Sequence, residues 1–186
     1  MAWMLVVIVV SIAVAVFRGG KISNLPDIHA DGWPLLFLGF GMQIGANFVP
    51  DDQRSLAVGL LLASYGTLIL MVWLNRRESG MWIAGLGILM NFIVISVNGG
   101  MPVLDASVEI AGGSSNLALD AKHVWLDATT RLPFLADVLP LPGAVISLGD
   151  VFLAIGLGVF VEDQLQQPVR LFRHRVKGIP GSAAEH

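Results

Sequence analysis

Four titratable side chains in the C-terminal half of the chain could take part in proton transfer. Asp150 and Asp137 are two carboxylates, and such a pair can divide acid and base roles when the groups approach each other, as in aspartyl catalysis. His123 titrates near neutrality and, on a helical turn, faces Asp127 at spacing i, i+4. These residue types indicate two candidate catalytic pairs, Asp150 with Asp137 and His123 with Asp127.

Each of these residues also has a structural interpretation. The sequence Ser147-Leu148-Gly149-Asp150 matches a capping box, in which the serine and the acid satisfy the first amides of a helix. The helix dipole favours a carboxylate at that position. Asp137 lies in a proline-rich segment, where it could be an acid of a solvated loop. His123 could be an exposed or structural histidine. The sequence leaves both interpretations open.

Further polar side chains fall toward one end of the apolar segments that contain them. Because hydrocarbon offers no water, polar groups inside a membrane face neighbouring helices or a wet cavity. Their shared depth predicts a polar pocket that opens toward the outer leaflet beneath a long loop. The alternative is that these groups only join helices through hydrogen bonds, at about 0.6 kcal/mol each. The residues predicted to line the pocket are Gln43, Asn47, Asn91, Asn98 and Ser147.

The composition predicts a membrane protein. Mean hydropathy is +0.74. Hydrophobic residues make up 55% of the chain and charged residues 13%, whereas ordinary soluble domains carry roughly 25% charged residues. The absence of cysteine excludes disulfides, thiolate metal sites and cysteine nucleophiles. A net charge of −3 does not indicate a nucleic-acid partner, and the sequence indicates no metal site and names no cofactor.

Apolar runs recur along the chain and predict an all-α membrane protein, a bundle of five transmembrane helices. A long outward-facing loop, containing short helical or re-entrant segments, precedes the last helix. These features predict one transmembrane domain over residues 1–168 and a basic cytoplasmic tail over 169–186. The predicted spans are residues 2–17, 33–49, 55–74, 81–97 and 144–161, with the outer loop at 98–143.

The distribution of lysine and arginine predicts the orientation, because cytoplasmic loops carry an excess of these residues. One side of the predicted bundle holds eight of them and the other holds three. The N-terminus is therefore expected outside and the C-terminus in the cytoplasm, where a basic tail attracts anionic lipids. The eight are Arg18, Lys21, Arg76, Arg77, Arg170, Arg173, Arg175 and Lys177, and the three are Arg54, Lys122 and Arg131.

Three segments carry a resemblance to a known family: Asn98-Gly99-Gly100-Met101-Pro102-Val103, residues 130–137 (TRLPFLAD), and Ser147-Leu148-Gly149-Asp150. They resemble the motifs of a family of small bacterial integral membrane proteins known as a domain of unknown function. The resemblance implies a multi-pass protein of the bacterial plasma membrane. It brings no activity and no site residue with it.

A fainter similarity is to lipoprotein signal peptidases, which are also small helical bundles with an aspartate that enters the last helix from the outer side. The segment that ends at Asp150 is loosely like their asparagine-x-alanine-aspartate motif. Their second motif, an asparagine shortly before aspartate-arginine, is absent around Asp127 and Asp137. This departure leaves a second catalytic aspartate unassigned.

The sequence supports three hypotheses for function. The first is a binding or accessory protein whose outer pocket engages a membrane lipid or another membrane protein. The second is a membrane-embedded, aspartyl hydrolase-like enzyme that uses one of the two candidate pairs. The third is a component of a small transporter, which five spans and few charges at mid-membrane disfavour. The oligomeric state is not indicated.

Overall fold

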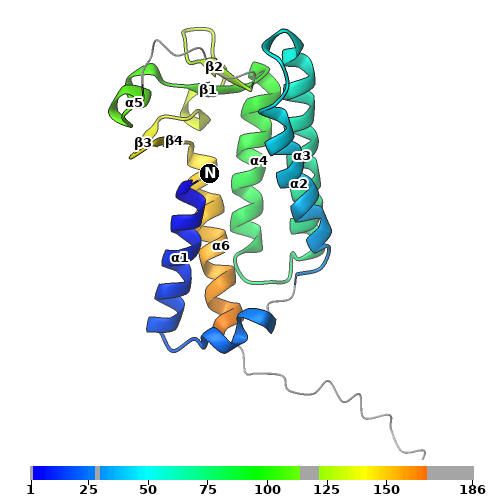
Figure 1. The fold of residues 1–186 in the computed structure, drawn as a ribbon, viewed down its shortest axis with the longest axis vertical. Helices are drawn as coiled ribbons and strands as arrows, with labels where there is room; N and C mark the ends of the chain where they lie inside the picture. Colours follow the sequence, from blue (N-terminus) through cyan, green and yellow to red (C-terminus); the bar gives the residue numbers. More distant parts are fainter. Residues whose placement is uncertain (1, 28–29, 114–121, 167–186) are drawn as a thin grey trace, which may run out of the picture.

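The structure of the protein is a computed structural model that describes residues 2–27, 30–113 and 122–166. Within these residues, five helices of 14 to 21 residues form the body of the molecule (Figure 1). The tail predicted at 169–186 lies outside the described residues. The five helices are α1 (Ala2–Phe17), α2 (Trp33–Ala46), α3 (Arg54–Leu74), α4 (Met81–Asn98) and α6 (Leu148–Gln166).

Glycine and proline set several helix ends. Gly80 precedes α4 and Gly99 follows it, with φ of 78° and 64°, a left-handed conformation that glycine adopts without steric strain. Pro34 lies in the first turn of α2, where its missing N–H needs no partner. Because these signals are local, α1 has the predicted bounds, and α3 and α4 each differ from the predicted segment at one end by a single residue.

Two of the predicted segments need correction. α2 ends at Ala46, before residue 49, because the amides of Asn47 and Phe48 bond to the carbonyls of Ile44 and Gly45 in a turn. α6 begins at Leu148 and reaches Gln166, whereas the prediction placed it at 144–161. The helix starts later because residues 144–146 form a strand, and Ser147 caps the helix that follows.

α3 and α4 are long and apolar enough to cross a membrane. The 21 residues of α3 correspond to about 32 Å, close to the ~30 Å thickness of a hydrocarbon core. α1 and α2 are shorter, with 16 and 14 residues. In the described part of the chain, two helices therefore meet the criteria of length and composition for spanning, where the sequence predicted five spans.

The long helices stand side by side in the order α1, α6, α4, α3, α2 (Figure 1), and the closest contacts are between neighbours in this order. Small residues allow α4 and α6 to approach each other: Gly156 lies against Ala84, and Gly149 lies against Gly87. α4 is thus the central element, packed between α6 and α3. This order leaves α2 and α6 as the two sides of a groove that α3 and α4 line between them.

One end of the helix row is covered by residues 99–113 and 122–146, which we call the cap. It contains strands, so the all-α prediction is wrong for this part of the chain. Prolines at 102, 140 and 142 lie in or beside these strands and are poorly compatible with a continuous helix. The strands pair as β1 (Met101–Val103) with β2 (His123–Trp125), parallel, and β3 (Leu139–Leu141) with β4 (Ala144–Ile146), antiparallel. The other elements of the cap are α5 (Asp105–Ile110) and the 3-10 helix η3 (Pro133–Leu135).

The opposite end is tied together by polar contacts between turns. The Arg18 guanidinium lies 2.6 Å from the Glu162 carboxylate, and the Gln164 amide donates to Glu78 at 3.0 Å. Asn75, which is buried, accepts from the Asp31 amide and donates to the Asp31 carbonyl, both at 2.7 Å. These contacts join α1 to α6, α6 to the turn before α4, and the end of α3 to the turn before α2.

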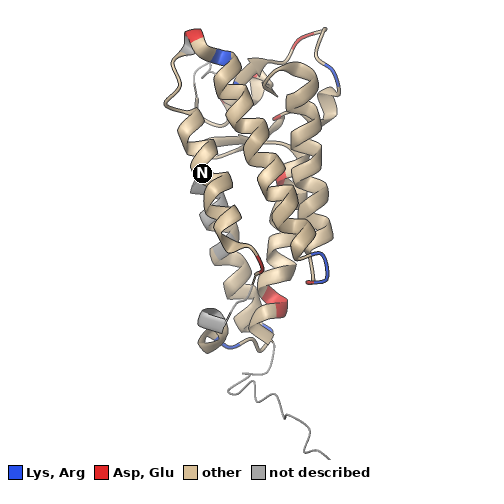
Figure 2. Cartoon of the chain, turned by 90° about the vertical axis from the view of Figure 1, so that its right-hand side faces the viewer, with Lys and Arg blue, Asp and Glu red and all other residues tan. Residues whose placement is uncertain are grey.

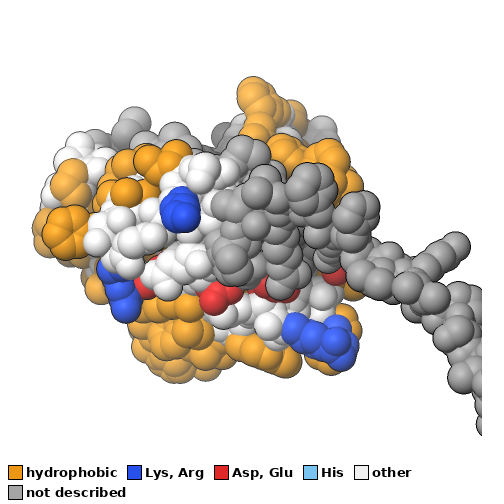
Figure 3. All heavy atoms as spheres, turned by 90° about the horizontal axis from the view of Figure 1, so that it is seen from below, with side chains coloured by type: hydrophobic (Ala, Val, Ile, Leu, Met, Phe, Trp, Pro, Cys, Tyr) orange, Lys and Arg blue, Asp and Glu red, His pale blue; other side chains and the backbone are white. Residues whose placement is uncertain are grey.

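Charged residues gather at the two ends of the helices, with few between them (Figure 2). Seen along the helices from the end opposite the cap, apolar side chains surround a more polar centre (Figure 3). The lateral surface is therefore largely apolar. Its exposed large side chains include Val9, Phe37, Leu38, Leu56, Leu70, Trp73, Trp82, Leu86, Leu89 and Ile155.

Candidate functional site

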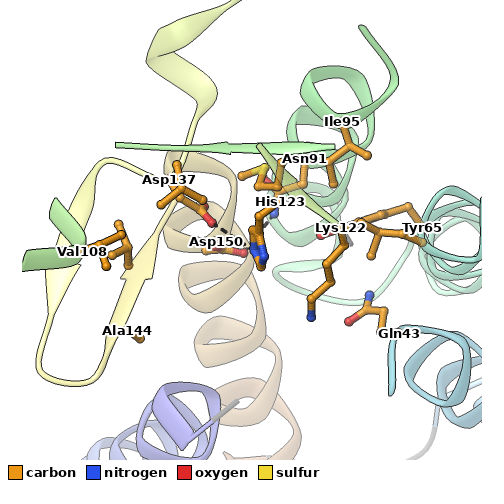
Figure 4. A pocket seen from close by; sticks show the side chains of 14 residues that line it. Gln43, Tyr65, Asn91, Ile95, Val108, Lys122, His123, Asp137, Ala144 and Asp150 are labelled. Carbon is orange, nitrogen blue, oxygen red and sulfur yellow. Dashed lines mark hydrogen bonds and ion pairs between the residues drawn. The ribbon is translucent and has the colours of Figure 1, made fainter. Parts of the chain in front are cut away.

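A cavity of about 390 Å³ lies between the cap and the halves of α3, α4 and α6 nearest to it. We call it the chamber (Figure 4). Its polar side chains come from every element around it, so a ligand in it would be contacted from several directions. They are Gln43 from α2, Tyr65 from α3, Asn91 from α4, Lys122, His123 and Asp137 from the cap, and Asp150 from α6.

A hydrogen-bond network joins α4 to the start of α6 at the chamber wall. Asn91, which is buried, donates through Nδ2 to Asp150 Oδ1 at 2.9 Å and accepts from Ser147 Oγ at 2.8 Å. The Ser147 amide donates to Asp150 Oδ2 at 3.1 Å, and the Asp150 amide donates to Ser147 Oγ at 3.0 Å. These reciprocal bonds are those of the predicted capping box. Asp150 therefore caps its helix and lines the chamber at the same time.

The backbone of the cap holds Asp137 in place. Its amide donates to the Pro102 carbonyl at 2.8 Å, and its carbonyl accepts from the Leu104 amide at 3.0 Å. Val103 forms a parallel bridge with Asp137, so the 98–103 and 130–137 motifs lie side by side. The side chain of Asp137 turns into the chamber toward Asp150 and His123 (Figure 4).

The Asp137 carboxyl is buried and incompletely partnered. Its Oδ2 lies 4.0 Å from His123 Nε2, too far for a hydrogen bond. Its Oδ1 has no hydrogen-bond partner among the described residues. Burial raises the pKa of the Asp137 carboxyl well above its usual range, the charge of Asp150 raises it further, and Lys122 opposes both. The structure thus places a buried carboxyl group, whose surroundings favour its protonated form, beside a second carboxyl group.

Asp137→Asn is expected to raise the melting temperature at pH 7. The pKa of Asp137 is higher in the folded chain than the value of about 3.9 in an unfolded chain. The folded state therefore loses stability as pH rises from the unfolded pKa to the folded pKa. Asparagine cannot ionise and escapes this loss. Melting curves of both proteins between about pH 4 and pH 7 should show a gap that widens with pH; a constant or reversed gap would contradict the assignment.

Asp127→Asn provides the matched control. Hydrogen bonds from Thr129 and Thr130 lower the pKa of the exposed Asp127 carboxyl. The effect on stability therefore has the opposite sign. The stabilisation from Asp127 is fully present above its pKa in the unfolded chain and is lost as pH falls through its lower pKa in the folded chain. Its asparagine variant should gain no stability at pH 7.

His123 does not pair with Asp127 as predicted. His123 lies in strand β2 opposite Met101, and its side chain enters the chamber. Asp127 lies in an exposed turn, where Oδ1 accepts from the Thr129 amide at 2.8 Å and the Thr129 hydroxyl at 2.7 Å. The predicted helical turn is wrong because residues 123–125 pair with β1. The acid beside His123 is Asp137.

The predicted pocket residues are placed in three ways. Gln43 and Asn91 line the chamber, and Ser147 supports its wall through Asn91. Asn47 is exposed and donates to the Gln43 carbonyl of its own helix at 3.1 Å, outside the chamber. Asn98 bonds to the Arg131 backbone, at 2.9 Å as donor and 2.8 Å as acceptor, and so holds residue 131 of the cap against α4.

The residues predicted to line the pocket did not include Tyr65 or Lys122, which also line the chamber. Tyr65 is the only tyrosine of the chain and lies in the middle of an apolar helix, a position that could have marked it. Lys122 offered no such signal, because its place depends on the pairing of β2 with β1. The amide of Met101 donates to the Lys122 carbonyl at 2.8 Å.

An apolar groove of about 550 Å³ continues from the chamber along the helices. Asp150, Leu153, Leu157 and Phe160 follow one face of α6 along it. From residue 150 to residue 160 an α-helix rises about 15 Å, which sets the length of the groove. The other lining side chains include Leu36 and Phe40 of α2, Leu68 and Met71 of α3, and Met81, Ala84 and Ile88 of α4.

The chamber and the groove share three residues, Gln43, Tyr65 and Asp150. The chamber is rich in polar and charged groups, and the adjoining groove is lined mainly by aliphatic and aromatic side chains. Within residues 2–27, 30–113 and 122–166, no three His, Asp or Glu side chains are grouped so that they could hold a metal ion. The arrangement suits an amphiphilic molecule.

Comparisons with known proteins place the chain in a family of unknown function. The profile of a family of unknown function (DUF5317) matches residues 27–162. An uncharacterised protein of Thermotoga maritima is 29% identical over 147 residues, which cover 76% of this chain and 80% of that protein. No solved structure matches the chain significantly.

Proposed function

The chain belongs to this family of unknown function (DUF5317), and we propose that it is a multi-pass membrane protein that binds an amphiphile. The polar head of the amphiphile occupies the chamber, and its apolar chain lies in the groove between α2 and α6. The observation that carries this proposal is that the chamber and the groove share Gln43, Tyr65 and Asp150 and therefore adjoin.

The membrane location rests on the lateral surface of the helices. Large exposed apolar side chains cover it on all five long helices, which is the property of a surface that meets lipid. Among the described residues, four of the lysines and arginines lie at the end opposite the cap, namely Arg18, Lys21, Arg76 and Arg77, and in the sequence four more, at 170–177, follow the end of α6. In a bacterial plasma membrane this asymmetry puts the cap and the chamber outside, the N-terminus outside and the C-terminus in the cytoplasm.

A lipid fits this space better than a water-soluble ligand does. The groove extends about 15 Å along α6 beyond Asp150 with few side chains that could satisfy a polar group. An extended peptide would leave its amides unpaired there, whereas an acyl chain needs no partner. The head, in contrast, would meet carboxyl, amide, phenol, imidazole and ammonium groups in the chamber.

Leu157→Trp is expected to reduce the amount of bound amphiphile about tenfold, because the larger side chain fills the groove. Tenfold corresponds to about 1.4 kcal/mol of binding free energy. The measurement is mass spectrometry of lipids that co-purify with the full chain from membranes in a mild detergent. Retention of the same lipid by Leu157→Trp in the same amount would rule out the groove as its site.

Ile155→Trp is the matched control on the same helix. Ile155 is exposed on the lateral surface and does not line the groove. Its tryptophan variant should co-purify with as much lipid as the wild-type protein. Equal losses in the two variants would assign the lipid to the outer surface of the bundle, in the manner of ordinary annular lipid.

A further inference from the structure

We propose that Asp137 and Asp150 are a general acid and a general base that hydrolyse the ester or amide bond joining an acyl chain to its polar head. This inference rests on the proposed function, since it requires an amphiphile in the chamber and the groove. It adds a reaction and a substrate class, acyl lipids, to the binding of an amphiphile proposed above. It would place the activity of the protein at the outer leaflet.

The two carboxyl groups face one cavity from independent elements. Asp150 stands at the first turn of α6, and Asp137 is held by its backbone beside β1 (Figure 4). Both line the chamber, and the charge of Asp150 acts on the Asp137 carboxyl. Paired carboxyl groups whose surroundings differ are the arrangement that assigns one the role of acid and the other that of base.

The surroundings of the two groups differ in hydrogen bonding. Asp150 accepts from Asn91 Nδ2 at 2.9 Å and from the Ser147 amide at 3.1 Å. Such N–H donors suit a carboxylate, which only accepts. Asp137 is 7% exposed, and its Oδ1 lacks a partner among the described residues. A buried carboxyl oxygen of this kind is available to bond to a substrate atom in the chamber.

The position of Asp150 locates the bond that would be cleaved. Asp150 lines both the chamber and the groove, at the place where the surroundings change from polar to apolar. In an acyl lipid, the carbonyl group lies at the corresponding change from chain to head. A chain in the groove therefore brings the carbonyl carbon to Asp150, with Tyr65 and Gln43 also at this level.

The reaction balances with water as the only co-reactant. The Asp150 carboxylate removes a proton from a water molecule, whose oxygen bonds to the carbonyl carbon while Asp137 gives its proton to the carbonyl oxygen. The tetrahedral intermediate then loses a hydroxyl proton to Asp137. The bond from carbon to the head group breaks, and the head leaves with the proton held by Asp150. The products are a fatty acid and an alcohol or amine, and both aspartates return to their starting states.

The test uses palmitoyl para-nitroanilide as probe, presented in detergent micelles to the purified full chain. The wild-type protein should release para-nitroaniline, seen by its absorbance. Asp137→Asn and Asp150→Asn should each lower the rate about a hundredfold or more, the usual effect of losing a general acid or base. Both variants should still retain the intact probe on gel filtration. Asp127→Asn, which lies outside the chamber, should keep the full rate.

The outcomes separate the two proposals. Asp150 also caps α6, so loss of activity in Asp150→Asn alone could follow from a folding defect; Asp137→Asn removes no hydrogen bond of the Asn91–Ser147–Asp150 network and decides the matter. A wild-type protein that retains the probe without cleaving it, or an Asp137→Asn variant that cleaves it at the wild-type rate, would overturn the hydrolase and leave the binding function. A protein that does not retain the probe would overturn both.

Discussion

Gly156→Ala should destabilise the folded protein by about 2–3 kcal/mol, the upper part of the range for overpacking a tight interface. A Cβ atom at residue 156 would lie 2.7 Å from both Cα and Cβ of Ala84 and still closer to the Ala84 amide. Backbone on both sides prevents either helix from yielding without separating α4 from α6. Chemical unfolding in a mild detergent, followed by circular dichroism, measures the change.

Gly66→Ala is the control for this effect. Gly66 lies in α3, and no described heavy atom outside its immediate backbone comes within 4 Å of a Cβ built there. Alanine is the better helix former by about 1 kcal/mol, so this variant should match or exceed the wild-type stability. If Gly66→Ala and Gly156→Ala lowered the stability equally, the close α4–α6 contact would not be the reason for the loss at residue 156.

Asn91→Leu should destabilise the protein by about 3 kcal/mol and distort the chamber. The substitution removes the donor to Asp150 and the acceptor of Ser147 together, and it leaves a carboxylate and a buried hydroxyl short of partners. Each buried group left unsatisfied costs about 1–3 kcal/mol, with more for a charged group. Equilibrium unfolding gives the stability, and the retention of lipid reports the state of the chamber.

Asn47→Leu separates this network from a general effect of removing an amide. Asn47 is exposed and donates to a carbonyl one turn earlier in its own helix. Its loss should change stability by less than about 1 kcal/mol, as is usual for surface positions. A double variant, Asn91→Leu with Asp150→Leu, should recover part of the stability that Asn91→Leu loses. The second substitution removes the carboxylate that the first one deprives of its amide donor. Additive losses in the double variant would contradict the coupling.

The ends of the helices could be read from the sequence because their signals are local. Gly80 precedes α4 and Gly99 ends it, and Ser147 with Asp150 forms a capping box from residues three apart. The cap could not be read in the same way. Each of its strands has three residues, and β1 finds its partner β2 across the length of α5 and the segment after it. Short strands depend on such partners more than on their own composition.

For the candidate site, too, the sequence identified individual residues, whereas the fold decided which of them are neighbours. The sequence singled out Asp150, Asp137 and His123 as groups that could do chemistry, and the structure brings all three to one cavity. The sequence-based prediction paired His123 with Asp127, whereas the nearby acid is Asp137. The prediction assumed a helical turn, and a strand gives His123 different neighbours. It placed Asn47 in the pocket on spacing alone, although α2 ends one residue earlier and leaves that side chain exposed.

The groove was invisible to sequence reasoning for a physical reason. An apolar stripe such as Leu153, Leu157 and Phe160 has the same spacing whether it packs against another helix or lines an open space. Only the order α1, α6, α4, α3, α2 separates α6 from α2 and leaves the stripes of four helices facing a common space.

The sequence alone determined the apolar character of the chain, the positions of most helix ends and the cap of α6, since each depends on residues within a few positions of one another. The tertiary structure decided which carboxyl groups share a cavity, which residue His123 faces and where the apolar groove lies. Those properties depend on contacts between residues far apart in the chain, such as Asn91 with Asp150 and Val103 with Asp137, and on the closeness of α4 and α6 that their glycines permit.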